Sequence, residues 1–319
     1  MKFRLSREAR IAAVLAAALC RPPVAVASTA PQVKEDVLWD AVAHTVEQVQ
    51  SRTDGVLGVA LVDLETGRRF ALRGDERFPQ ASTIKIAVLA ELVREDDAND
   101  GVHLSDRYVV DAADLVADSD ILGGLTPGVT TLTHRDLATC MVAVSDNTAT
   151  NVLIDRIGMA RVNALLDRLG LPQTRLKRKM MDLSAAKDGR ENVSTPNEMA
   201  TLLSRLWRAD GAVLSPEARS RFFDLLATHK DSQIPSGLPA DIRIANKPGS
   251  LEGVRNDAGI VFLPRRPYVI VVMGTYLKRE SDGEEAIRQI SRAAFDLFDR
   301  LDRATDLGRV ISPGNGATR

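Results

Sequence analysis

The hydrophobic and polar positions of this chain follow two different periods. Residues 33–49 have apolar side chains at helical spacing and a polar opposite face, which predicts an amphipathic helix. Two β-type runs follow at 57–64 and 69–72, separated by the turn sequence Glu-Thr-Gly-Arg, and this pattern predicts a β-hairpin. Comparable runs return only late, at 242–247, 258–263 and 268–275, before a last helical segment at 284–301.

The middle of the chain is patterned for helices. Thr133 and Asp136 form a capping-box signature, and Thr195 precedes a proline as an N-cap residue does. Residues 177–194 are polar without clear periodicity, and a loop of this length in a compact domain is usually functional. The expected helices span 84–93, 133–144, 148–157, 160–169 and 196–207.

This order of elements predicts an α/β fold of the α+β type. Strands from both ends of the chain would form one antiparallel sheet of about five strands, flanked by the first and last helices, with the middle inserted as an all-α subdomain. We expect one domain over 28–303 and a C-terminal tail over 304–319. Within that domain, the sheet subdomain would comprise 33–75 and 240–303, and the helical subdomain 76–239.

The amino terminus has the pattern of an export signal. Four basic residues between Lys2 and Arg10 precede an apolar run over 11–19, and Ala25-Val26-Ala27 offers small residues to a signal peptidase. We expect a signal peptide over 1–27 and a periplasmic or extracellular mature protein. A lipid anchor on Cys20 is the alternative. Cleavage after Ala27 would remove Cys20 and leave Cys140 as the mature chain's single cysteine, which excludes an internal disulfide.

Composition removes several classes of function. The 42 basic and 43 acidic residues give a net charge of −1, so there is no basic field to hold nucleic acid. The sequence contains no His-Glu-x-x-His or paired-cysteine metal motif and no Gly-rich phosphate loop. We expect no cofactor, no metal and no stable membrane insertion, but a monomer that binds a small-molecule substrate.

Ser82-Thr83-Ile84-Lys85 is the first motif with chemical meaning. Positions i and i+3 of a helix share one face, so the lysine amine can meet the serine hydroxyl. A nucleophilic serine needs such a base, and a lysine serves if its pKa is depressed by burial or by another cation. In isolation, the same four residues also fit a surface serine near a solvated lysine.

Two further motifs follow in order. Ser145-Asp146-Asn147 comes after an apolar helix, where the serine could relay a proton and the asparagine could bind a substrate carbonyl. The alternative is a simple N-cap and turn. Lys247-Pro248-Gly249-Ser250 ends a predicted strand; Lys247 supplies a cation and Gly249 permits close approach of a substrate backbone. The alternative there is a strand-ending turn.

Taken together, the three motifs resemble those of the penicillin-recognising serine enzymes, most closely the class A β-lactamases. The resemblance covers roughly residues 34 to 303. The segment 133–149 is similar to the family's helix leading into its Ser-Asp-Asn loop, and 176–183 with 195–200 is similar to its Ω-loop and the helix that follows.

The resemblance implies a role for each motif residue. Ser82 would be the nucleophile, Lys85 its base and Ser145 the proton relay. The other implied contacts are substrate-binding ones, made by Asn147, Lys247, Gly249 and Ser250, with the backbone N–H groups of Ser82 and Ser250 as the oxyanion hole. Lys85 and Lys247 in one pocket should depress each other's pKa. The implied reaction is opening of the β-lactam amide through an acyl-enzyme on Ser82.

Two departures from the family pattern stand out. The Ω-loop glutamate that activates the deacylating water falls at Met180, and a thioether is no general base. Asp182 and Glu191 are the nearby carboxylates that could replace it, or they could be solvated groups that brace the loop. Pro248 stands where the family has a hydroxyl residue against the substrate carboxylate, and Ser250 or Arg255 could compensate.

Three functions therefore remain open from the sequence. The leading hypothesis is a serine β-lactamase. The first alternative is a penicillin-binding D,D-peptidase or esterase that acts on a cell-wall peptide or another acyl donor. The second is a penicillin-binding protein that acylates and then deacylates slowly, for which Met180 is the main argument.

Overall fold

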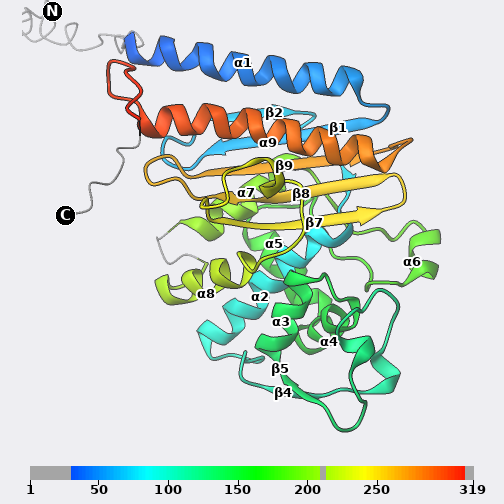
Figure 1. The fold of residues 1–319 in the computed structure, drawn as a ribbon. Helices are drawn as coiled ribbons and strands as arrows, with labels where there is room; N and C mark the ends of the chain where they lie inside the picture. Colours follow the sequence, from blue (N-terminus) through cyan, green and yellow to red (C-terminus); the bar gives the residue numbers. More distant parts are fainter. Residues whose placement is uncertain (1–29, 209–212, 313–319) are drawn as a thin grey trace, which may run out of the picture.

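The computed structural model describes residues 30–208 and 213–312, and its centre is one antiparallel sheet (Figure 1). The strand order is β2-β1-β9-β8-β7, so both ends of the chain contribute strands and the predicted five-stranded sheet is confirmed. The strands are β1 (Val56–Asp63), β2 (Arg69–Leu72), β7 (Ile244–Leu251), β8 (Val254–Val261) and β9 (Tyr268–Thr275).

The first and last helices, α1 (Ala30–Arg52) and α9 (Glu280–Arg303), cover one face of the sheet (Figure 1). Their apolar sides are buried against the strands, as the helical spacing of 33–49 and 284–301 predicts. Phe298 of α9 stacks on Tyr268 of β9 at 4.2 Å between ring centroids and meets Trp39 of α1 edge-on at 5.5 Å. These two helices therefore bury the face of the sheet, whose edge strand is β7.

The helical half lies on the other face, with α2 (Lys85–Ala98) at its centre. Every residue from Ile86 to Val93 is buried, which explains an apolar run without a polar face. The surrounding helices are α3 (His134–Ala143), α4 (Asn147–Ile157), α5 (Met159–Arg168), α7 (Pro196–Trp207) and α8 (Pro216–Leu226). Two small two-stranded sheets pair β3 (Phe78–Pro79) with β6 (Val193–Ser194) and β4 (Arg107–Val109) with β5 (Thr131–Thr133).

The structure differs from the predicted elements in several ways, and the two small sheets were not predicted. Helix α8 was missed, although Ser215 before Pro216 is an N-cap signal, and the Ser215 hydroxyl does accept from the Ala218 N–H. The segment 177–194 is not structureless but contains the short helix α6 (Leu183–Lys187) and β6. Strand β7 was predicted to end at Lys247 but runs on to Leu251, because Pro248 lies on an edge strand, where a missing N–H is tolerated.

The predicted signal peptide and the Cys20 anchor lie outside the described residues. Over 30–208 and 213–312, no helix combines the length and the apolar character needed to cross a bilayer. Cys140 is half-buried and packs against the core, and burial raises the pKa of its thiol.

Candidate active site

Ser82 lies in the 3₁₀ turn η2 (Ala81–Ile84) that leads directly into α2. Ala81 before it has a left-handed φ of 48°, a strained conformation for a residue with a Cβ. Asn256 of β8 braces this turn, because its Nδ2 donates to the carbonyls of Pro79 at 2.8 Å and Gln80 at 3.1 Å. The sheet therefore positions the half-buried Ser82 at the amino end of the central helix.

Lys85, the first residue of α2, is 1% exposed and its amine is surrounded by oxygens. The Nζ lies 2.6 Å from the Ser145 carbonyl, 3.0 Å from the Ser145 Oγ and 2.9 Å from the Asn147 Oδ1. Burial first, and then the Lys247 charge, hold the pKa of Lys85 well below its usual range, against the carboxylates of Asp146 and Asp118. The structure thus brings the first two motifs together and favours the neutral form of the Lys85 amine.

Ser145 and Asn147 are held by the residue between them. Asp146 is fully buried and caps α4 by accepting from the Ala149 N–H at 2.9 Å. Its other carboxylate oxygen accepts from the N–H groups of Ile121 and Leu122 at 3.1 and 2.9 Å. Ser145 takes a left-handed φ of 59° just before this cap. The N-cap and the functional interpretations of the motif are therefore compatible.

Lys247 brings the third motif to the same hydroxyl. Its Nζ lies 3.0 Å from the Ser145 Oγ and 3.0 Å from the Pro248 carbonyl, and the side chain is 1% exposed. Burial and the charge of Lys230 lower the pKa of Lys247 to about 7, although the Asp257 carboxylate opposes the shift. The Ser145 hydroxyl lies between two lysine amines, which suits it to pass a proton.

Strand β7 passes very close to the Ser82 turn. A Cβ on Gly249 would lie 2.8 Å from the Gln80 carbonyl oxygen and 3.0 Å from the Ser82 nitrogen, so only glycine fits. Pro248 faces Asp257 in the ladder but has no N–H to exchange. The Pro248 carbonyl therefore points away from β8, to the free edge of the sheet. Because the backbone pattern of a strand repeats every two residues, the N–H of Ser250 is expected to point to the same edge.

The loop before α7 has a buried methionine, Met180, at the position where the family pattern has a glutamate. Met180 is 7% exposed, and its backbone N–H and carbonyl are both bonded to the Asn151 amide, at 2.8 and 3.1 Å. With Asn151 and Asp182 it lines a cavity of about 260 Å³. The Met180 side chain also packs with the core of the helical half. The position is thus fixed by its backbone and holds no titratable group.

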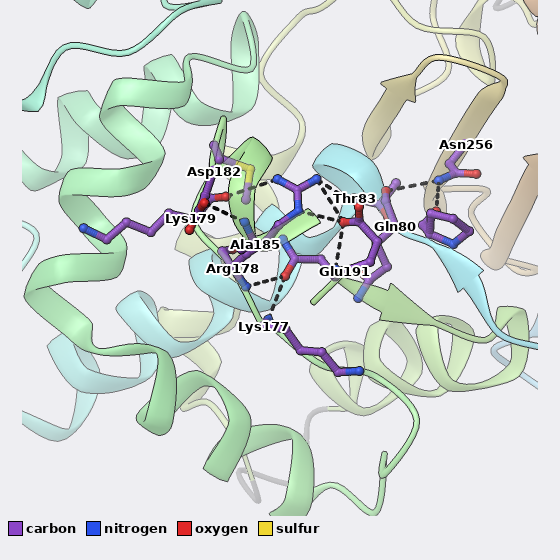
Figure 2. A network of polar contacts seen from close by, with 12 residues as sticks. Gln80, Thr83, Lys177, Arg178, Lys179, Asp182, Ala185, Glu191 and Asn256 are labelled. Atoms are coloured by element: carbon purple, nitrogen blue, oxygen red, sulfur yellow. Dashed lines mark hydrogen bonds and ion pairs between the residues drawn. The ribbon is translucent and has the colours of Figure 1, made fainter. Parts of the chain in front are cut away.

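The two carboxylates that could replace the glutamate, Glu191 and Asp182, both bind other groups of the loop (Figure 2). Glu191 forms a two-pronged ion pair with the buried Arg178, with Nε at 3.0 Å and Nη2 at 2.9 Å from Oε1. Asp182 caps α6 by accepting from the Ala185 N–H at 2.9 Å. Both contacts are those of groups that brace the loop.

Arg255 is engaged with two carboxylates of α9, and its contribution to substrate binding stays a prediction. Residues on one strand alternate between faces, and Arg255 lies opposite Ser250 on the face covered by α9. Its guanidinium pairs there with Glu280 and with Glu284, the latter at 3.2 Å. Two carboxylates hold a side chain that the sequence alone left free to point either way.

Several residues that shape the site carry no local sequence signal. Asn256 braces the Ser82 turn from a strand more than 170 positions away. Asp257 is buried beside it and accepts from the N–H groups of Gln233 and Ile234 and from Asn246. Lys230, after α8, donates to the Leu226 carbonyl at 2.8 Å. Burial lowers the pKa of Lys230 to about 8, and only the tertiary fold reveals its effect on Lys247.

The described residues contain no group of three His, Cys, Asp or Glu side chains placed to share a metal ion. What the structure does bring together is the Ser82 turn, two buried lysines, the Ser145 hydroxyl between their amines, and an edge strand beside the turn. These are the parts of a serine enzyme that transfers an acyl group.

Comparisons with known proteins agree with that class. The family model described as the beta-lactamase enzyme family matches residues 41–298, and the chain belongs to this family of serine hydrolases. It is similar to the β-lactamase AST-1 of Nocardia asteroides, at 33% identity over 93% of this chain and 97% of the relative. It is also similar to the β-lactamase SME-1 of Serratia marcescens, at 29% identity over 82% and 90%.

Solved structures give the same result. An ancestral class A β-lactamase superposes with a TM-score of 0.74 at 32% identity, covering 81% of this chain and 100% of that one. A β-lactamase from Sphaerobacter thermophilus superposes with a TM-score of 0.73 at 34% identity, covering 81% and 97%. The class A fold expected from the motifs is confirmed.

Proposed function

We propose that this protein hydrolyses β-lactams through an acyl-enzyme on Ser82. The observation that carries the proposal is the hydrogen-bonded chain from Lys85 through the Ser145 hydroxyl to Lys247, built beside the Ser82 turn. A neutral Lys85 has two N–H groups to donate, to the Ser145 carbonyl and the Asn147 Oδ1. Its lone pair meets the Ser145 hydroxyl, 3.0 Å away, and would accept the Ser82 proton in the reaction.

In this mechanism Lys85 takes the Ser82 proton while the Ser82 oxygen attacks the lactam carbonyl carbon. The N–H groups of Ser82 and Ser250 would stabilise the oxyanion, and Gly249 supports this role because it brings β7 against the Ser82 nitrogen. The proton then passes through the Ser145 hydroxyl to the lactam nitrogen as the C–N bond breaks. Water later attacks the acyl carbon and the bond to the Ser82 oxygen breaks. The water oxygen stays on the ring-opened acid, and one water proton returns to the Ser82 oxygen.

Substrate binding would use the remaining polar groups of the site. Lys247 supplies a cation for the carboxylate that β-lactams carry next to the ring nitrogen. Asn147 offers its amide to the carbonyl of the acyl side chain. The exposed hydroxyl of Ser250, on the same edge strand, is the available substitute for the hydroxyl that Pro248 lacks.

We further propose that deacylation is slower than acylation. Met180 offers no base at the loop position, and Glu191 and Asp182 are engaged with Arg178 and the α6 amide. Intact-protein mass spectrometry with benzylpenicillin, followed over time beside Ser82→Ala, tests both steps. The expected result is a Ser82-dependent adduct that clears as penicilloate accumulates. Absence of an adduct would refute the acylation proposal, and clearance as fast as formation would refute slow deacylation.

We also propose that the protein is exported after cleavage before Ser28, on the basis of the basic and apolar pattern of residues 1–27. Amino-terminal sequencing of the protein recovered from outside the cytoplasm tests the cleavage site. A mature chain that begins at Cys20 with an added lipid mass would establish the alternative instead.

A further inference from the structure

One wall of the substrate-binding region is formed by the segment from Val116 to Ser119, which is fixed to the start of α4. The Asn147 backbone N–H donates to the Asp118 carbonyl at 3.3 Å, and the Asn147 Nδ2 donates to the Ala117 carbonyl at 3.3 Å. The Thr148 hydroxyl forms two further hydrogen bonds, with the Ser119 hydroxyl at 2.7 Å and with the Val116 N–H at 3.0 Å. The segment is therefore held in place on both sides of Asp118.

Asp118 itself has an unusual combination of properties. Its backbone is left-handed, with a φ of 55°, and its side chain is exposed. Within 30–208 and 213–312, no cation forms an ion pair with its carboxylate. The carboxylate nevertheless raises the pKa of Lys85, together with Asp146, against burial and the Lys247 charge. The electrostatic effect of the Asp118 carboxylate therefore extends to the Lys85 amine.

The amide of Asn147 links this charge to a part of the substrate. The Oδ1 is used by Lys85 and one Nδ2 hydrogen by Ala117, which leaves one hydrogen for a substrate carbonyl. If that carbonyl belongs to the acyl side chain, the next carbon of the side chain lies over residues 117 and 118. A charge on that carbon would be close to the carboxylate of Asp118.

We infer that Asp118 determines specificity by favouring β-lactams with a protonated amine beside the side-chain carbonyl over those with a carboxylate there. The inference rests on the proposed function of the same site. Three penicillins test it, since benzylpenicillin, ampicillin and carbenicillin carry a hydrogen, an ammonium and a carboxylate on that one carbon. Second-order acylation rates from quenched-flow mass spectrometry at pH 6 make the comparison independent of deacylation.

The decisive variant is Asp118→Asn, because asparagine tolerates the left-handed backbone and removes only the charge. An exposed ion pair suggests that the ampicillin rate, relative to benzylpenicillin, falls by about threefold and the carbenicillin rate rises by about threefold. The ampicillin-to-carbenicillin ratio then changes by about tenfold, and 0.5 M salt should reduce the preference of the unmodified protein. Asp120→Asn, an exposed acid on the same loop, should leave the ratio unchanged.

The outcomes separate the two levels of the argument. An unchanged ratio in Asp118→Asn, with benzylpenicillin still acylating Ser82, overturns the inference and leaves the proposed function intact. An equal change in Asp120→Asn also overturns it, because the effect would then belong to the charge of the whole loop. Failure of benzylpenicillin to acylate the unmodified protein refutes the proposed function itself.

Discussion

Replacing Lys247 by methionine should make the protein more stable at neutral pH while removing acylation. Burial lowers the pKa of Lys247 from 10.5 to about 7, and at 1.36 kcal/mol per unit the buried cation costs about 4–5 kcal/mol of unfolding free energy. Methionine loses two hydrogen bonds, to Ser145 and Pro248, worth about 2 kcal/mol together. The net gain at pH 7 is therefore about 2–3 kcal/mol.

The sign of the effect should depend on pH. Below pH 7 both folded and unfolded states hold the Lys247 proton and the full penalty is present. As the pH rises toward 10.5, the folded state has already lost its proton, so the penalty shrinks by about 1.4 kcal/mol per unit. Near pH 9 it falls to about 2 kcal/mol and matches the two lost hydrogen bonds, so the two proteins should be equally stable.

Urea unfolding of Lys247→Met and the unmodified protein at pH 7 and pH 9 measures this difference. Lys278→Met is the matched control, since the Lys278 side chain is 79% exposed and its removal should change stability by less than about 0.5 kcal/mol at either pH. A Lys247→Met protein that is less stable at pH 7, or whose difference from the unmodified protein is the same at both pH values, would refute the reasoning.

Three other changes have definite expected results. Asp146→Ala leaves the N–H groups of Ile121, Leu122 and Ala149 without their carboxylate partner, and the last two bonds are buried. The change should cost about 2–4 kcal/mol in thermal or urea unfolding; a cost below about 1 kcal/mol would contradict this account of the cap. Met180→Glu should shorten the lifetime of the benzylpenicillin adduct, measured by mass spectrometry, because it restores a carboxylate beside the loop cavity. Lys230→Met should raise the pKa of Lys247 and move the alkaline decline of the acylation rate to higher pH; an unmoved profile would show that the two lysines do not interact.

The sequence predicted the parts of the fold and site that depend on local patterns. The continuous apolar run at 268–275 and the helical spacing of 33–49 identify a central strand and its covering helix, since both patterns depend only on which side chains are buried. The site residues Ser82 and Lys85 were found because one helical turn joins them. The prediction ended strand β7 before Pro248, because a proline is tolerated only on an edge strand. The order of the strands, which shows that β7 is at the edge, cannot be obtained from the local sequence.

The remaining features depend on contacts between distant segments. The orientation of Arg255 follows from which helix covers its face, and two carboxylates of α9 decide it. Asn256 and Asp118 influence Ser82 and Lys85 across many residues of intervening chain. Neither residue belongs to a recognisable motif, so only the tertiary structure shows that they border the site.

The site concentrates several features that oppose folding. Lys85, Lys247 and Asp257 are each almost completely buried, and Ala81 and Ser145 have left-handed backbones without being glycine. These unfavourable groups lie where the two halves of the molecule meet, between the hydrophobic cluster of the helical half and the sheet. The packing of α2 and of the strands stabilises the whole and so permits a locally unfavourable arrangement. Burial of its own amine, and then the charge of Lys247, keep the pKa of Lys85 low. The burial that makes these two lysines unfavourable for stability therefore also favours the neutral Lys85 that the proposed mechanism requires.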